Sequence, residues 1–162
     1  MALSADPPPP QLAALPADAG VASLYQEIIL SHYRAPKHKR LIDGAAAAVE
    51  HRNPLCGDVC SVQLSLDDDR IIDAAFSAHA CSITQATASM LLDRIIGATV
   101  SDARTVMTRV DEMLDSAARL SDQAPGDDLG DLRALASVSR FPARRACVRL
   151  VLGAVREAIS AV

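Results

Sequence analysis

Aromatic residues are scarce in this sequence: among 162 residues there is no tryptophan, and there are only two tyrosines and two phenylalanines. Half of the residues are nevertheless apolar, and alanine is prominent among them. Alanine favours helices, and small side chains fill little volume. The length is enough for one domain with its own core. We therefore expect a single helix-rich α+β domain.

Two further absences limit the possible partners and compartments. No run approaches the ~20 apolar residues that a membrane-spanning helix needs, and residues 1–20 lack the basic and apolar regions of a signal peptide. There is no surplus of positive charge, since the net charge is −4 and the pI is about 5.5. A nucleic-acid or anionic-membrane binder would show a basic face. The sequence predicts a cytoplasmic protein that binds neither nucleic acid nor membrane.

A C-x-x-C pair is also missing, although the chain has four cysteines, at positions 56, 60, 81 and 147. The cytoplasm keeps thiols reduced, so disulfides are not expected. Without paired short spacings, neither a zinc ribbon nor a thioredoxin-type site is indicated. Spacing alone leaves the four cysteines unassigned.

The expected elements are one helix, then three strands, then a run of helices. This order fits a small sheet packed by helices. Residues 1–20 are rich in proline and alanine and are predicted to be a disordered tail, which leaves residues 21–162 as the domain. Strands are expected over residues 45–52, 62–66 and 71–77, the last two as a hairpin that turns at 67–69. Helices are expected over residues 23–33, 82–96, from about 101 to 114, 131–138 and 143–160. Ser23 is the predicted N-cap of the first helix, and Ser82 with Gln85 matches a capping box.

Three of the cysteines fall at loops or at predicted helix N-termini. Cys56 lies in the loop NPLCGD, Cys81 directly precedes a helix, and Cys147 is placed in the first turn of the last helix, after Arg144. A helix N-terminus and a nearby arginine both lower the pKa of a thiol, and the thiolate is the form that binds metal or attacks sulfur. Taken singly, however, a free cysteine is more often a small buried apolar residue.

Four motifs together resemble one family. SLYQEIILSHYRAPKHKR, NPLCGD, CSITQATASML and FPARRACVRL occur in the order found in U-type iron–sulfur assembly proteins, over about residues 23–160. The resemblance implies the SufE/IscU-like α+β fold, in which helices pack on a small antiparallel sheet. It also implies a metal site made of Cys56, Asp58, Cys81 and Cys147.

The same resemblance distinguishes two branches of the superfamily. The cluster-scaffold branch has a histidine before its third cysteine and a nearby Leu-Pro-Pro-Val-Lys motif, whereas here Ala146 takes the histidine position and that motif is missing. Arg144 matches the arginine of the SufU branch. SufU-like proteins hold zinc and accept persulfide sulfur from a cysteine desulfurase. The expected activity is therefore a zinc-dependent sulfurtransferase, with Cys56 and Arg144 as the catalytic residues.

The family mechanism implies that a histidine of the desulfurase replaces Cys56 on zinc, which frees Cys56 to take the sulfur for downstream iron–sulfur assembly proteins. Two alternatives stay open. One is a scaffold that assembles a transient [2Fe–2S] cluster, or binds iron, on the same ligands. The other is a non-catalytic domain that zinc stabilises.

Several residues have a plainer interpretation beside the functional one. Asp58 could be a turn residue, and Arg144 could only cap its helix. Cys60 is expected to be a structural thiol. In the stretch Ala78-His79-Ala80, alanines replace the glycines usual in the family; this puts the backbone shape of the loop in question, and His79 is expected to face solvent. The basic residues 37–40 are either a docking surface or a solvated helix terminus.

Overall fold

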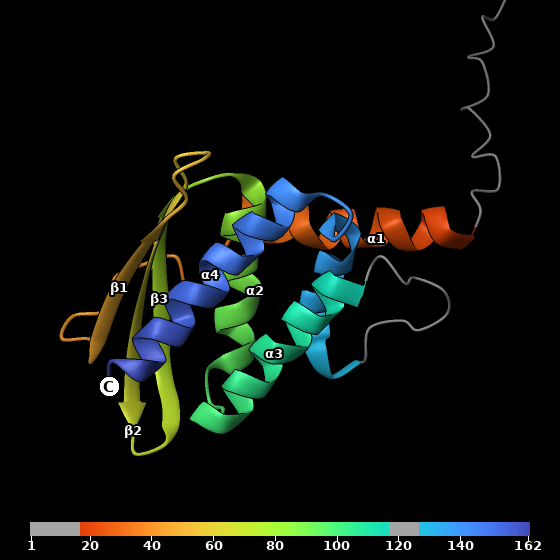
Figure 1. Cartoon of the computed structure of the whole chain (residues 1–162). Coiled ribbons are helices and arrows are strands. Elements are labelled where there is room, and N and C mark those ends of the chain that lie inside the picture. The colour runs from red at the N-terminus through yellow and green to blue at the C-terminus, as the bar shows by residue number, and fades with distance from the viewer. Residues whose placement is uncertain (1–16, 117–126) are drawn as a thin grey trace, which may run out of the picture.

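The computed structural model describes residues 17–116 and 127–162. Three strands come early in the chain, between a first helix and a run of helices (Figure 1). In order, the elements are α1 (Ala17–Arg34), β1 (Ala47–Arg52), β2 (Val59–Asp67), β3 (Arg70–His79), α2 (Ser82–Ile95), α3 (Val100–Ser116), the 3-10 segment η2 (Asp127–Val138) and α4 (Pro142–Ser160). The predicted α+β class is confirmed.

The sheet is antiparallel throughout, in the order β1-β2-β3. Apolar and polar residues alternate along β2, so Cys60, Val62 and Leu64 are all buried on one face. The turn after β2 is tight, and Asp68 adopts a positive φ of 51°, which aspartate tolerates better than most residues. The predicted hairpin is therefore confirmed, with a register shift at Ser65/Leu66.

Helices cover one face of this sheet. α4 crosses β1 and β2, and α2 lies behind α4 against β3 (Figure 1). α1 packs across α2 and η2, while α3 packs against η2 and α4. Apolar side chains from the sheet and from every one of these helices meet in one core. Among the described residues, no helix has the length and apolar character needed to cross a membrane.

One glycine sets how closely α4 approaches the sheet. A Cβ atom at Gly153 would lie 3.0 Å from Nδ1 of His51, a residue of β1. The same imidazole contacts the Glu157 carboxylate one turn further along α4, at 2.5 Å. A larger residue at position 153 would therefore have to displace the His51 imidazole.

Three sequence-based expectations about boundaries are wrong. α1 begins at Ala17, inside the stretch predicted as a tail, because its alanine-rich start favours helix; Ser23 is thus interior and not an N-cap. Residues 1–16 lie outside the described part of the chain. The N-cap of α2 is Cys81, not Ser82, and no side chain caps it. The predicted loop 121–130 is 3-10 structure from Asp127 onward, and its residues 121–126 lie outside the described residues.

Candidate metal centre

The loop between β1 and β2 holds Cys56 and Asp58 in a closed turn. The backbone N–H of Asn53 donates to the carbonyl of Asp58 at 2.8 Å, and the N–H of Gly57 donates to the carbonyl of Asn53 at 2.9 Å. The Asn53 side chain also accepts from the N–H of Leu55 at 3.0 Å. Gly57 has φ +74°, a conformation that suits glycine. The turn leaves Cys56 exposed at its tip while it directs Asp58 inward, where only 8% of the residue is accessible.

The N-terminus of α2 forms the second side of the site. The Asp58 carboxylate accepts hydrogen bonds from the Cys81 N–H at 3.3 Å and from the Thr84 hydroxyl at 3.0 Å. Unpaired N–H groups at a helix N-terminus favour a negative charge nearby. The Cys81 thiol lies 3.5 Å from the Thr84 hydroxyl. Asp58 is thus more than a turn residue, because it fastens the β1–β2 loop to α2.

α4 supplies the third side through Cys147. Its sulfur lies 3.5 Å from the Cys81 sulfur and 3.9 Å from Oδ2 of Asp58. Ligand atoms of Cys56, Asp58 and Cys147 all lie within 4.8 Å of one another. Cys81 joins this group through its contact with Cys147. The four residues predicted as ligands therefore come together from two loops and a helix that lie far apart in the sequence.

The expectation of a depressed thiol pKa is wrong for Cys147 in the metal-free chain. Pro142 is the first residue of α4, so Cys147 lies in its second turn, away from the unpaired N–H groups, and its sulfur faces the Ala143 carbonyl at 3.3 Å. Burial and the neighbouring Cys81 thiol raise the pKa of Cys147 to about 12. Only a cation bound at this position would keep the thiol deprotonated at neutral pH.

The carboxyl of Asp58 shows the opposite behaviour. Burial alone would raise its pKa, but the hydrogen bonds from Cys81 and Thr84 outweigh burial and hold the pKa below its ordinary value. The group is therefore a buried carboxylate at neutral pH. A buried negative charge is costly unless it is hydrogen-bonded or binds a cation, and a metal would complete its environment.

The donor set fits a tetrahedral metal. A zinc–sulfur bond of about 2.3 Å places two thiolate sulfurs of a tetrahedral site about 3.8 Å apart. The separation of 3.5 Å between the Cys81 and Cys147 sulfurs is close to that value. Three sulfurs with one carboxylate suit Zn²⁺, and they suit iron as well. The residues present can hold such an ion with only small adjustments of side chains.

The other residues singled out in the sequence lie around this group. Arg144 is exposed, and its guanidinium lies over the ring of Phe141, 5.9 Å from the ring centroid. Cys60 is fully buried in the sheet, and burial raises its pKa to about 12, which agrees with a structural thiol. His79 is exposed beside the site. Within the described residues only His38 and Asp68 combine a side chain with positive φ, so Ala80 fits the loop without strain.

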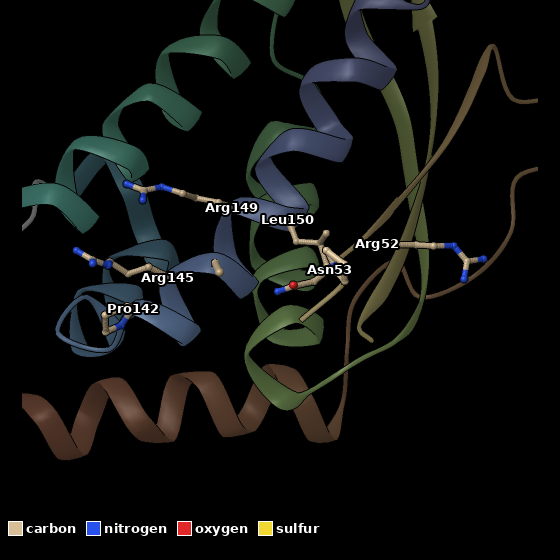
Figure 2. Close-up of a pocket in the computed structure, with 8 residues that line it drawn as sticks. Arg52, Asn53, Pro142, Arg145, Arg149 and Leu150 are labelled. Atoms are coloured by element: carbon tan, nitrogen blue, oxygen red, sulfur yellow. The ribbon is translucent and has the colours of Figure 1, made fainter. Parts of the chain in front are cut away.

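Two hollows flank the ligands. One, of about 490 Å³, is lined by Cys56, Gly57 and Asp58 together with residues from three other segments, which are Lys39, Ala78, His79, Ala80 and Gln85. The other, of about 420 Å³, lies between the β1–β2 loop and α4. Figure 2 shows Arg145 and Arg149 pointing to one side of this second hollow and Arg52 to the opposite side. Their guanidinium groups do not converge, so this hollow does not form an anion site.

Thr84 is the residue of the centre that sequence reasoning missed. It is fully buried, and it contacts both the Asp58 carboxylate and the Cys81 thiol. The available signal was its place three residues after Cys81 on a helix, which puts both side chains on the same turn. A buried threonine in the first turn of a helix needs a hydrogen-bond partner, and the aspartate of the NPLCGD motif was a candidate acceptor.

The chain is similar to several known proteins. The NifU-like N terminal domain family matches residues 24–148. The chain is 35% identical to the iron–sulfur cluster assembly scaffold protein IscU of Streptococcus pyogenes, over 84% of this chain and 82% of the relative. It is 32% identical to the zinc-dependent sulfurtransferase SufU of Bacillus subtilis, over 88% and 94%.

A solved structure supports the same assignment. The N-terminal part of a nitrogen-fixing NifU-like protein from Brucella abortus superposes with a TM-score of 0.75 at 25% identity, and the match covers 87% of this chain and 95% of that one. The family resemblance predicted from the four motifs is therefore confirmed. The chain belongs to the family of the NifU-like N terminal domain.

Proposed function

We propose that this protein works in iron–sulfur cluster biogenesis as a zinc-dependent sulfur acceptor. In this proposal Cys56, Asp58, Cys81 and Cys147 hold one zinc ion, and a cysteine desulfurase of the SufS type donates sulfur to Cys56. The observation that carries the proposal is that ligand atoms of Cys56, Asp58 and Cys147 lie within 4.8 Å of one another, with the Cys81 sulfur 3.5 Å from that of Cys147 and Cys56 exposed at the tip of its loop. The relative named as a zinc-dependent sulfurtransferase matches nearly the whole chain.

Accessibility separates two of the four ligands from the other two. Cys56 and Cys81 are exposed, whereas Asp58 and Cys147 are buried. Cys56 follows Leu55, which is 93% exposed, while the Cys81 thiol lies 3.5 Å from the Thr84 hydroxyl. When bound, the ion would keep the thiols as thiolates without oxidising them, because zinc has no redox chemistry. A donor protein that covers the tip of the β1–β2 loop would reach Cys56, the exposed cysteine of that loop. Arg144, exposed at the start of α4, is positioned to contact such a donor.

The proposed transfer balances without an oxidant. The Cys56 thiolate attacks the outer sulfur of the donor's cysteine persulfide, and the donor's sulfur–sulfur bond breaks. The donor cysteine leaves as a thiolate, while Cys56 carries the sulfur as a persulfide anion. Downstream iron–sulfur assembly proteins would then take this sulfur. The reaction needs reduced thiols, so we place the protein in the cytoplasm.

A sulfur-acceptance assay with a matched cysteine control tests the proposal. Persulfide on the protein is measured by mass spectrometry after incubation with a cysteine desulfurase and cysteine. Cys56→Ala should abolish acceptance, whereas Cys60→Ala should retain it because Cys60 is fully buried in β2 and cannot meet a donor. Full acceptance by Cys56→Ala would refute the assignment.

The second candidate function is a scaffold for a [2Fe–2S] cluster. The observation in its favour is the 35% identity to a relative named as an iron–sulfur cluster assembly scaffold protein. Thiolates bind either metal, so the metal content decides between the two. About one zinc per chain and no visible absorbance would favour sulfur acceptance. Iron with visible charge-transfer bands would favour the scaffold.

A further inference from the structure

The basic segment Lys37–Arg40 contains one side chain whose partner differs in charge from those of its neighbours. Lys37 donates to Asp93 Oδ2 at 2.8 Å, and His38 contacts the other oxygen of Asp93 at 3.1 Å. Arg40 pairs with Asp73. Lys39 instead donates to the neutral Oε1 of Gln85, at 2.8 Å. No carboxylate in the described part of the chain pairs with Lys39, so its charge is uncompensated.

The backbone fixes this lysine at the metal centre. The carbonyl of His38 accepts from the N–H of Phe76 at 2.9 Å, and Lys39 forms a parallel bridge with the same residue of β3. The Gln85 side chain donates in turn to the Ala80 carbonyl at 2.8 Å, next to Cys81. The side chain that resembled part of a capping box thus links Lys39 to the ligand loop. Lys39 and Cys56 line the same hollow.

The net charge of the metal-loaded centre makes a nearby positive charge relevant to sulfur transfer. Three thiolates and one carboxylate around a divalent cation leave a net formal charge of about −2. The proposed transfer brings a persulfide anion to this negative centre and leaves an anion on Cys56. Like charges oppose such an approach, and an unpaired ammonium group at the rim would offset part of the repulsion.

We infer that Lys39 is the counter-charge for the anionic sulfur that is delivered to Cys56. In naming that anion as persulfide sulfur, the inference rests on the proposed function. Gln85 acts as a positioning residue, because it holds the ammonium group over the hollow. The plainer interpretation is that Lys39 and Gln85 only join the 37–40 segment to α2, in which case the charge itself has no effect on Cys56.

Two alkylating reagents of similar size test the charge directly. Iodoacetate is an anion and iodoacetamide is neutral, and both react with the thiolate, so the ratio of their rates at Cys56 does not depend on how much thiolate is present. The full-length protein with its metal bound is used. Trypsin releases residues 53–70 as one peptide, in which fragment masses separate Cys56 from the buried Cys60.

Lys39→Gln should lower the iodoacetate-to-iodoacetamide ratio at Cys56 about threefold, the order of effect expected when one positive charge is removed from the same hollow in water-like surroundings. Lys39→Arg should keep the wild-type ratio. Lys37→Gln removes the same charge from the same segment, but its ammonium faces Asp93, so the ratio should also stay at the wild-type value. An unchanged ratio in Lys39→Gln, or an equal fall in Lys37→Gln, would overturn the inference.

The desulfurase assay then links this effect to sulfur transfer. Lys39→Gln should raise the KM for the donor about threefold, and Lys39→Arg should restore it. The alkylation ratio requires no sulfur transfer. A wild-type protein that accepts no sulfur would therefore refute the proposed function alone, while an unchanged ratio would refute the role of Lys39 alone.

Discussion

Both ends of α2 face a hollow of similar volume, but the residues that line the two hollows differ in chemistry. Its N-terminal end faces a hollow of about 490 Å³ beside Cys56 and Asp58, and its C-terminal end faces one of about 460 Å³. At the C-terminal end the lining is mainly arginine and backbone: Arg70 donates to the Gly97 carbonyl, Arg94 donates to the Asp128 carbonyl, and Arg109 pairs with the Asp128 carboxylate.

This difference shows that the candidate metal centre is distinguished from the other end of α2 by its donor atoms and not by the size of its hollow. Arginines that donate to carbonyls near a helix C-terminus complement its partial negative charge and join neighbouring segments. The N-terminal end instead gathers sulfur and carboxylate ligands. Variants at the two ends should therefore separate metal binding from stability.

The largest expected effect is the loss of metal when a buried ligand is removed. Cys147→Ser replaces a thiolate ligand by a hydroxyl that zinc binds poorly, so zinc should fall from about one per chain towards none. Elemental analysis of purified protein measures this. Arg94→Ala, at the opposite end of α2, is the control and should retain full zinc. A full complement of zinc in Cys147→Ser would show that this cysteine is not a ligand.

A core variant at the C-terminal end of α2 should lower the stability of the protein and leave its zinc content unchanged. Ile95 is fully buried, and Ile95→Ala should lower the free energy of unfolding by about 3 kcal/mol through lost packing and the cavity left behind. Denaturant unfolding of the zinc-loaded protein gives this value. Zinc content should stay near one per chain. If zinc were lost together with stability, the two ends would be one cooperative site and the comparison would fail.

Removing a hydrogen bond that supports a ligand should have a smaller effect on zinc binding than removing the ligand. Thr84→Val keeps the side-chain shape but removes the hydroxyl that donates to Asp58, so zinc affinity should fall about 10- to 100-fold while one ion still binds. Competition with a chelator measures the affinity. Thr87→Val is the matched control, because Thr87 is buried one turn further along α2 and its hydroxyl has no hydrogen-bond partner. Equal losses in both variants would indicate a general effect on the helix.

The smallest expected effect is the pH dependence that Asp58 gives to the metal-free protein. Its folded-state pKa lies below the ordinary value of 3.8, so its contribution is present above that value and is lost as the pH falls through the folded pKa. Asp58→Asn should remove about 1 kcal/mol of the acid-induced loss of stability below pH ~4. Urea unfolding at several pH values measures it. An unchanged acid limb in Asp58→Asn would mean that other carboxylates account for it.

Much of the fold was predictable because it depends on local pattern. Alternating residues in β2 and the acidic turn at 67–69 predicted the hairpin, and Pro142 marked the start of α4. The errors came where two local signals competed. Ser82 with Gln85 matched a capping box, but Gln85 binds the Ala80 carbonyl and Lys39 instead. A tertiary partner 46 residues away in the sequence cannot be inferred from helix periodicity.

The candidate site was likewise predictable where it depends on sequence motifs and unpredictable where it depends on tertiary packing. The NPLCGD and CSITQATASML motifs predicted which residues gather, and the structure brings these residues together. The protonation of Cys147 was predicted with the wrong sign, because burial against Cys81 depends on how α4 packs and not on neighbours in the sequence. Thr84 was missed because it reaches Asp58, 26 residues earlier in the sequence, through a contact between separate segments.

The contact between Gly153 and His51 joins α4 to the edge strand β1. Gly153 is the point where the helix comes so close to β1 that a Cβ atom would lie 3.0 Å from the imidazole. A methyl group added at position 153 would have to displace this imidazole by a few tenths of an ångström, and the contact of the ring with Glu157 would change with it. The position of the His51 ring is therefore set in part by a residue that bears no side chain.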